Sequence, residues 1–406
     1  MNEPIELPGS DDRPGPSRVD ELVARLLAGE KRNLCVVGDI DQNIYSWRGA
    51  DIEHLLNFER AFPGAKVVLL EQNYRSTRTI LTAANGVIEK NKRRVPKMLY
   101  TDNPTGEAIS TYGGRNEIDE AWFIAAMCVD QIEKGTKPGE IAVLYRETAQ
   151  SRAIEEAMLA ATIPYRVLGV RFFERKEVKD ALSYLRAAGN PKSRVDLLRI
   201  VGTPARGIGK VTLDKMLAGE EDALTGAAKL KVDVFKQSLA KIKHAIDTLP
   251  ASEAVRFAIE ESGLERMYQG GSEEDREHLG NLRELVNLAV RYDEHTSPEG
   301  IERLLEEAAL QSEQDGLSIN NEADQAGQVA LMTVHASKGL EFDTVFVTGL
   351  EQGLFPSMRE GDGDRDSEEE RRLFYVALTR ARKKLFLTYA AERMRWGSRE
   401  YTLPSE

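Results

Sequence analysis

Short apolar runs recur along the chain and are separated by segments with helical periodicity. In chain order, the runs occupy residues 34–37, 66–70, 141–145, 328–334, 344–347 and 384–389. A short continuous apolar run is typical of a strand that is buried on both faces of a parallel sheet. Because helical segments such as 117–132 and 151–159 lie between the runs, the pattern predicts an α/β fold with parallel sheets.

The long stretch from 181 to 326 has a different pattern. Apolar residues recur there at helical spacing among many charges, and strand-like runs nearly vanish. We therefore predict an all-helical insertion over these residues. Residues 1–18 are polar, rich in Pro and Gly and without periodicity, which predicts a disordered lead, and a helix is expected over 19–27.

Composition and charge narrow the functional classes only a little. The chain of 406 residues is long enough for two or three domains, and its net charge of −12 is a weak argument against nucleic acid. A narrow basic and aromatic track can still bind DNA on an acidic protein. No apolar stretch approaches the ~20 residues of a membrane helix, so a cytoplasmic protein is expected. Cys35 and Cys128 lie in apolar segments and are predicted to be buried, and the scattered histidines predict no metal site.

Candidate chemistry gathers where the first run ends. A carboxamide, two aromatic rings and a guanidinium follow within a few residues, supplied by Gln42, Tyr45, Trp47 and Arg48. Ligands in open α/β sheets bind outside the carboxyl ends of the strands, so these side chains are placed to meet a nucleotide and unstacked bases. The alternative is an ordinary strand followed by an amphipathic turn whose aromatic side chains enter the core.

The exact sequence of this segment favours the functional interpretation. Residues 38–50, GDIDQNIYSWRGA, closely resemble the third motif of the UvrD/Rep/PcrA helicases, superfamily-1 motors that unwind DNA in the 3′ to 5′ direction. The resemblance implies that Gln42 senses the terminal phosphate of ATP. It also implies that Tyr45 and Trp47 stack on single-stranded bases, with Arg48 beside them in the DNA site.

A second phrase, LLEQNYRST over residues 69–77, is similar to the fourth motif of the same helicases. An arginine that follows a strand can donate a planar fork to a phosphate, although an isolated one is more often a surface residue paired with an acid. The resemblance implies that Tyr74 stacks on adenine and that Arg75 contacts the γ-phosphate of ATP.

The most specific match is TVHASKGLEFDTVFV over residues 333–347, which is similar to the fifth motif. It implies that Thr333 and His335 contact the DNA strand and that Glu341 reaches the nucleotide sugar. A helix predicted over 370–382 matches the sixth motif, which makes Arg380 a second arginine finger on the γ-phosphate. Finger arginines contribute ~10³–10⁵ in rate in well-studied nucleotide hydrolases.

Weaker signals complete the set of candidate residues. Residues 172–180 resemble a further family motif that places an aromatic side chain, here Phe172, near the single strand. Gly207 and Gly209 have the spacing of a tight hairpin that touches duplex DNA in the family, although a plain turn between helices is the alternative. The basic residues at 90–94 and Lys97 could meet the DNA backbone or form a solvated helix end.

The resemblance implies a domain organisation. Residues 19–77 would form the C-terminal part of a first RecA-like domain, after the lead over 1–18. Residues 78–180 and 327–406 would form a complete second RecA-like domain, which carries the helical insertion over 181–326. The implied cofactors are ATP and Mg²⁺. The implied partners are single-stranded DNA, single-strand to double-strand junctions and other repair proteins, with no membrane.

One part of the family pattern is missing from the sequence. The phosphate loop G-x-x-x-x-G-K-[ST] does not occur, because Gly209-Lys210 is followed by Val211, and no acidic motif that could bind Mg²⁺ follows a strand before residue 35. We therefore expect a large fragment of a helicase that hydrolyses ATP poorly by itself and exposes one sheet edge. The alternatives are a DNA-binding or regulatory protein without motor activity and, less favoured, the motor subunit of a helicase–nuclease complex.

Overall fold

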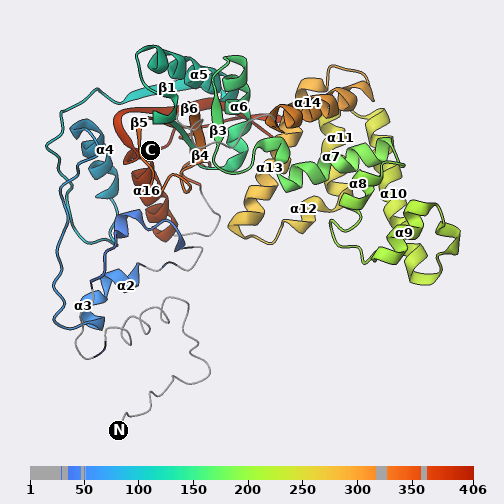
Figure 1. Ribbon diagram of the computed structural model, residues 1–406, viewed down its shortest axis with the longest axis horizontal. Coiled ribbons are helices and arrows are strands. Elements are labelled where there is room, and N and C mark those ends of the chain that lie inside the picture. The colour runs from blue at the N-terminus through green and yellow to red at the C-terminus, as the bar shows by residue number, and fades with distance from the viewer. Residues whose placement is uncertain (1–28, 30–34, 47–49, 51, 317–326, 358–363) are drawn as a thin grey trace, which may run out of the picture.

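The structure is a computed structural model that describes residues 29, 35–46, 50, 52–316, 327–357 and 364–406 (Figure 1). The predicted lead, the predicted helix over 19–27, Trp47 and Arg48 lie outside the described residues.

A seven-stranded sheet forms the centre of the molecule, with the strand order β1-β6-β5-β2-β4-β3 and β7 paired to β6. The strands are β1 (Ser110–Asn116), β2 (Ile141–Tyr145), β3 (Tyr165–Val167), β4 (Val329–Thr333), β5 (Phe342–Val347), β6 (Ala381–Arg395) and β7 (Ser398–Tyr401). All pairs are parallel except the antiparallel hairpin of β6 and β7. The predicted α/β class is therefore confirmed. The apolar runs that begin at 141, 344 and 384 lie in strands, and residues 329–333 of the run that begins at 328 form β4.

Helices cover both faces of this sheet, which explains why its central strands are continuously apolar. Ala142 and Leu144 of β2 point into one core together with α4 (Arg78–Ile88) and α16 (Asp364–Leu378). Val143 of the same strand points into a second core with α5 (Glu117–Glu133) and α6 (Ser151–Ala160). Successive side chains of a strand alternate between faces, so a strand covered on both sides needs apolar residues at every position. We call the sheet with these four helices the sheet body.

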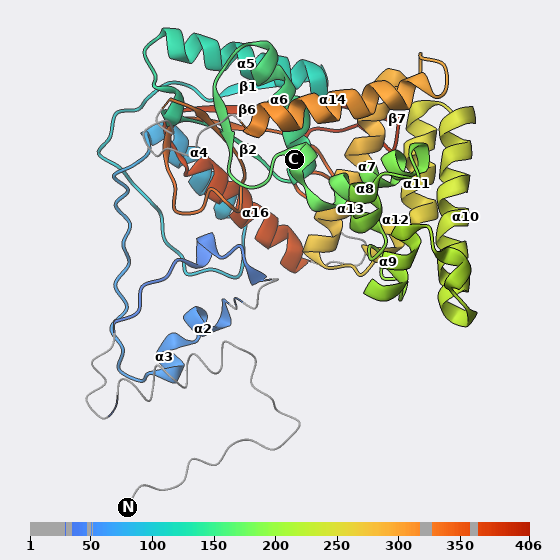
Figure 2. The ribbon, with the colours of Figure 1, turned by 45° about the vertical axis from the view of Figure 1, so that its right-hand side comes forward.

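A second body is entirely helical in its described residues and lies to one side of the sheet body (Figures 1 and 2). Its helices are α7 (Lys176–Gly189), α8 (Arg194–Ile200), α9 (Lys210–Ala218), α10 (Gly226–Thr248), α11 (Ala251–Ser262), α12 (Leu264–Met267), α13 (Glu273–Ala289) and α14 (Glu299–Gly316). They share one apolar core that extends from Phe172 to Ala308. We call this unit the helical body. None of the described helices is long and apolar enough to cross a membrane.

The two bodies meet through polar side chains. Arg146, at the end of β2, is buried and donates hydrogen bonds to Glu273 of α13 at 3.1 Å and to Glu370 of α16 at 2.9 Å. Burial acts to raise the pKa of Glu273, but the guanidiniums of Arg146 and Arg276 outweigh it and lower that pKa to about 2. Arg175, which directly precedes α7, donates hydrogen bonds to Asn281 of α13 at 2.7 Å and to the Ser151 hydroxyl of α6 at 2.8 Å.

Short 3₁₀ turns connect several helices and strands, and two of them contain the candidate residues Gln42 and Phe172. They are η1 (Ile40–Gln42), η3 (Pro138–Glu140), η4 (Thr148–Gln150), η5 (Phe172–Glu174), η6 (Glu221–Ala223) and η7 (Val290–Tyr292).

The segment before α4 differs from the prediction. It contains η1 and two single-turn helices, α2 (Glu53–Leu56) and α3 (Phe58–Ala61), and the described parts of the runs 34–37 and 66–70 form no strand. Val37 and Leu70 are 83% and 74% exposed, and Cys35, predicted to be buried, is exposed as well. A strand requires a partner for its backbone hydrogen bonds, and none of the strands in the described part of the chain pairs with either run. The predicted sheet edge is therefore an extended apolar segment.

Candidate functional site

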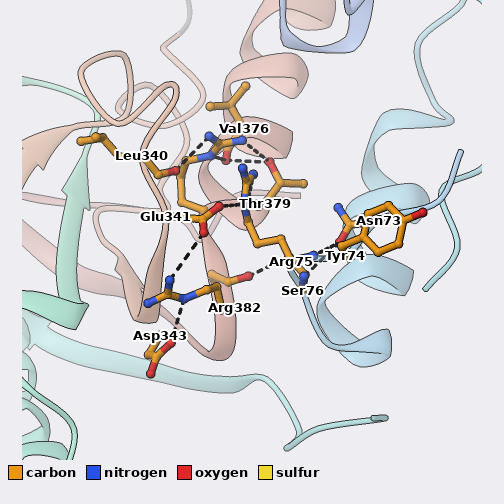
Figure 3. Close-up of polar contacts among 12 residues, drawn as sticks. Asn73, Tyr74, Arg75, Ser76, Leu340, Glu341, Asp343, Val376, Thr379 and Arg382 are labelled. Carbon is orange, nitrogen blue, oxygen red and sulfur yellow. Dashed lines mark hydrogen bonds and ion pairs between the residues drawn. The ribbon is translucent and has the colours of Figure 1, made fainter. Parts of the chain in front are cut away.

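Segments that are far apart in the sequence converge beside the end of α16. Arg75, on the segment that precedes α4, contacts both Glu341, just before β5, and Thr379, just after α16 (Figure 3). Lys338 of the loop after β4 donates a hydrogen bond from Nζ to the backbone oxygen of Gln42 at 2.8 Å. The fourth-, fifth- and sixth-motif segments therefore share one site, with the third-motif segment tied to its edge.

The backbone around Arg75 is held firmly to the sheet body. The Asn73 side chain accepts hydrogen bonds from the backbone N–H groups of Arg75 at 3.0 Å and Ser76 at 2.9 Å, which closes a local Asx-type turn. The buried Ser76 hydroxyl donates to the backbone oxygen of Ala381 at 2.7 Å, and the N–H of Thr77 donates to the backbone oxygen of Arg382 at 3.1 Å. These contacts fix the direction in which the Arg75 side chain leaves the backbone.

Arg75 is held by one carboxylate and one carbonyl. Its Nε donates to Glu341 Oε2, and its Nη1 donates to the Thr379 backbone oxygen at 3.2 Å. The hydrogen bond from Arg75 is the main cause that keeps the pKa of Glu341 below its ordinary value. The pair is partly exposed, at 29% and 43% of the two side chains, so its net contribution to folding stability is small, roughly 0–1 kcal/mol.

Arg380 is in a different situation, because it is a buried cation. Only 1% of the residue is exposed. Its hydrogen bonds within the described residues go to uncharged acceptors: the backbone oxygens of Val376 at 3.0 Å and Leu340 at 3.1 Å, and the Thr379 hydroxyl at 3.1 Å. Burial first, and then the nearby Arg75 guanidinium, lowers the pKa of Arg380 to about 10. A buried charge with no bonded counter-ion favours the binding of an anion.

Gln42 and Tyr74 lie differently. Gln42 donates from Nε2 to Asp39 at 2.8 Å, at the start of η1, so its carboxamide is engaged locally. Tyr74 is 78% exposed, its hydroxyl donates to Gln72 at 2.7 Å, and its ring extends away from the Arg75 guanidinium (Figure 3). The structure therefore brings Arg75, Glu341 and Arg380 together, with Gln42 linked through Lys338 and with Tyr74 directed outward.

The residues predicted to contact DNA form a second group next to this site. The Tyr45 hydroxyl donates to the His335 backbone oxygen at 3.0 Å, and the two rings lie 6.0 Å apart. Lys338 Nζ lies 5.2 Å from the centre of the Tyr45 ring, a cation–π contact. The Thr333 hydroxyl oxygen accepts a hydrogen bond from the Ala336 N–H at 3.2 Å, which shapes the loop after β4. Tyr45, His335 and Thr333 are thus neighbours.

The remaining predicted contacts lie in the helical body. Phe172 is 2% exposed and packs in the helical core with Arg175 over its ring at 5.4 Å, so in this structure its ring offers no face to a base. Gly207 has a φ of +66°, which favours glycine, and its backbone oxygen accepts a hydrogen bond from Lys231 at 3.0 Å. Gly209 caps α9, at the far end of the helical body from α16 (Figure 1). None of these three joins the Tyr45 group.

Sequence reasoning missed the role of the acids in the third motif. Arg94 donates to both oxygens of the buried Asp41, at 3.1 and 2.8 Å, and Lys97 donates to Asp39. Arg93 pairs with Glu53. These three members of the basic cluster therefore tie Asp39, Asp41 and Glu53 to the segment that follows α4. The sequence shows the acids and the cations but not the burial of Asp41, which requires a cation beside it. No group of three His, Cys, Asp or Glu side chains that could hold a metal ion occurs among the described residues.

Comparison with known proteins gives a consistent result. Residues 68–392 match the family model of the UvrD-like helicase C-terminal domain, and residues 17–63 match that of the UvrD/REP helicase N-terminal domain. The chain is 41% identical over 402 residues to DNA helicase II of Escherichia coli (strain K12), covering 94% of this chain and 55% of that protein. It is 38% identical over 417 residues to ATP-dependent DNA helicase PcrA of Staphylococcus aureus (strain MRSA252), covering 97% and 56%. The chain thus spans about half the length of the curated relatives it matches.

Proposed function

Because the chain belongs to the family of UvrD-like DNA helicases, we propose that it carries the phosphate-reading arginines and part of the single-strand track of an ATP-dependent 3′–5′ DNA helicase. In this proposal, hydrolysis of ATP at the Arg75–Arg380 site drives movement along single-stranded DNA and separation of the duplex.

One observation carries the proposal: Arg75 and Arg380 are brought together from different segments. Both guanidiniums hydrogen-bond to Thr379, Arg75 to its backbone oxygen and Arg380 to its hydroxyl. Two like charges held this close repel each other, and Arg380 has only uncharged acceptors among its bonds in the described structure. The terminal phosphate of a nucleoside triphosphate would neutralise both cations and accept their planar donors. The pair would then stabilise the charge that develops on the transferred phosphoryl group.

Glu341 and Gln42 have supporting roles. Glu341, next to Arg75, would accept a hydrogen bond from the nucleotide sugar, and Gln42 would meet the terminal phosphate once its bond to Asp39 is released. For magnesium, the described residues offer no group of three His, Cys, Asp or Glu side chains. We therefore assign to this chain the reading of the phosphate and the sugar, and no step that runs through the metal ion.

The single-strand track would include Tyr45, His335 and Thr333. A partly exposed tyrosine ring next to a lysine ammonium combines stacking with positive charge, the combination that sequence-tolerant single-strand binding requires. Lys338 joins this track to the nucleotide site through the backbone oxygen of Gln42. Movement of the η1 segment on nucleotide binding would therefore change the position of the Tyr45 ring.

The proposal is tested with the purified chain and a fluorescent duplex that carries a 3′ single-stranded tail. We expect binding to the tail in preference to blunt duplex, with an affinity that changes when ATP is added. Because the chain is expected to hydrolyse ATP poorly by itself, we expect only slow ATP-dependent strand separation. Replacement Tyr45→Ala should weaken binding to the tail by the value of one stacked base, about 1–3 kcal/mol. The matched control is Tyr401→Ala, because Tyr401 on β7 is 88% exposed and lies outside the track.

Two results would count against the proposal in different ways. Equal affinity for tail and blunt duplex, or equal losses with Tyr45→Ala and Tyr401→Ala, would remove the single-strand track. Binding to the tail that ATP neither changes nor converts into strand separation would instead favour the DNA-binding or regulatory alternative.

A further inference from the structure

The carboxylate of Glu341 lies between two arginines that belong to different segments (Figure 3). Its Oε2 accepts a hydrogen bond from Arg75 Nε, and its Oε1 lies 3.5 Å from Arg382 Nη1. Each oxygen of one carboxylate thus faces its own guanidinium. The other contacts of the two arginines show which of them can release Glu341.

Arg382 is anchored independently of Glu341. Its Nε donates to Asp343 at 2.8 Å, and its Nη2 donates to Glu140. The fork of one guanidinium therefore reaches three carboxylates, a geometry that the single ammonium of a lysine cannot reproduce. Loss of any one contact leaves Arg382 held in place by the other two.

Arg75 has a weaker hold on its surroundings. Apart from Glu341, its side chain donates in the described structure to a single carbonyl, that of Thr379 at 3.2 Å. Its backbone is fixed by Ser76 and Thr77, so a change of partner needs only rotation of the side chain. A rotation that turns Arg75 Nε toward a phosphate breaks its bond to Glu341, because one N–H cannot serve both anions.

We propose that Arg382 is a positioning residue that holds Glu341 in place while Arg75 is engaged with the nucleotide, an inference that rests on the proposed function. The carboxylate passes from Arg75 to Arg382 without moving far, because Arg382 already faces its other oxygen. Glu341 then remains charged and directed at the nucleotide site. Glu341 keeps its contact with Arg382, and Arg75 exchanges the carboxylate for the phosphate, so the release of Arg75 costs little.

The test is a pH titration of the Glu341 carboxyl carbon, followed by NMR of the ¹³C-labelled full chain and assigned with Glu341→Gln. Replacement Arg75→Ala imitates the state in which Arg75 has left. In that variant we expect the pKa of Glu341 to stay below the ordinary glutamate value, by a shift that partial solvent exposure reduces. In Arg75→Ala/Arg382→Gln it should return to the ordinary value.

The matched control is Lys383→Ala in the Arg75→Ala background. Lys383 pairs with Asp343 at 2.7 Å, as Arg382 does, and no contact joins it to Glu341 in the described structure, so the pKa of Glu341 should not move. An ordinary pKa in Arg75→Ala alone would overturn the proposal, and so would a pKa that stays low in the double variant. No nucleotide is added, so the result is independent of whether the chain binds ATP. The Arg75→Ala arm leaves Arg382 and its anchors intact, so it remains decisive if the double variant folds poorly.

Discussion

Two apolar runs of similar composition differ in structure and in exposure to solvent. Residues 141–145 form β2, which is paired on both sides and has no residue more than 2% exposed. Residues 67–70 are just as apolar, but they are 45–74% exposed and form no strand. The difference shows that an apolar run records the capacity to be a buried strand, whereas hydrogen-bonded neighbours decide whether the strand forms.

The same segment nevertheless holds candidate site residues in fixed positions. Residues 73–77, directly after the exposed run, are fixed to the start of β6 by hydrogen bonds of Ser76 and Thr77, and Asp41 is fixed by Arg94. Polar contacts with the sheet body, rather than burial of the apolar runs, therefore hold Arg75 and Tyr45 in position.

The largest effect on stability is expected when a leucine is replaced with alanine, once in the sheet core and once in the exposed run. Leu331→Ala in β4 opens a cavity in the sheet core and should lower the free energy of unfolding by about 2–5 kcal/mol. Leu70→Ala removes an exposed side chain and should change it by less than about 0.5 kcal/mol. Urea unfolding of the two variants measures the difference. Similar losses would mean that Leu70 is buried in solution and that the contrast between the runs is wrong.

A smaller effect on stability is expected where the segment before α4 is tied to the rest of the molecule. Arg94→Ala leaves the buried Asp41 without its two-pronged partner and should lower the free energy of unfolding by about 1.5–3 kcal/mol. The control Arg93→Ala breaks an exposed pair with Glu53 and should have an effect below about 1 kcal/mol. Hydrogen exchange at residues 40–46 localises the loss. A loss spread evenly over the sheet body would contradict the tethering role.

The smallest effect concerns pH at the joint between the two regions. The pKa of Glu341 is lowered in the folded chain, first by its hydrogen bond from Arg75, so its contribution is complete above the unfolded-state pKa. That contribution is lost as the pH falls from the ordinary glutamate value through the lowered one. Glu341→Gln should therefore flatten the dependence of stability on pH in this acidic window. Unfolding curves from pH 7 downward test this, with the exposed Glu133→Gln as control, and an unchanged slope would contradict the pairing.

The sequence predicted the centre of the fold better than its edges. The central strands β2, β4, β5 and β6 are apolar because both faces of the sheet are covered. Their apolar runs predicted them. β1 was missed because Ser110–Asn116 is polar and pairs only with β6 at the sheet edge. The helix predicted over 370–382 ends at Leu378, because the Thr379 hydroxyl and the Arg380 guanidinium turn back to α16 backbone oxygens. Such local competition for backbone groups leaves no mark in hydrophobic periodicity.

The candidate site was predictable only in part. The family resemblance named Arg75, Glu341 and Arg380, which the structure brings into one cluster, but it could not give the burial of Arg380 or the second partner of Glu341. Arg382 carries no motif signal, and its importance follows from its contacts with three carboxylates. Phe172 shows the converse, because its motif suggested a ring near the single strand and packing places it in the helical core. Contacts between distant segments decide both cases.

The most direct test of the account is a double-mutant cycle on nucleotide affinity with Arg75→Ala, Arg380→Ala and the double variant. Isothermal titration with ATPγS and with ADP separates the terminal phosphate from the rest of the nucleotide. If both arginines hold that phosphate, wild type binds ATPγS more tightly than ADP, and the cycle gives a coupling energy of at least about 0.5 kcal/mol for ATPγS and none for ADP. Equal affinities for the two nucleotides, or strictly additive losses, would contradict the claim that Arg75 and Arg380 form one phosphate-reading pair.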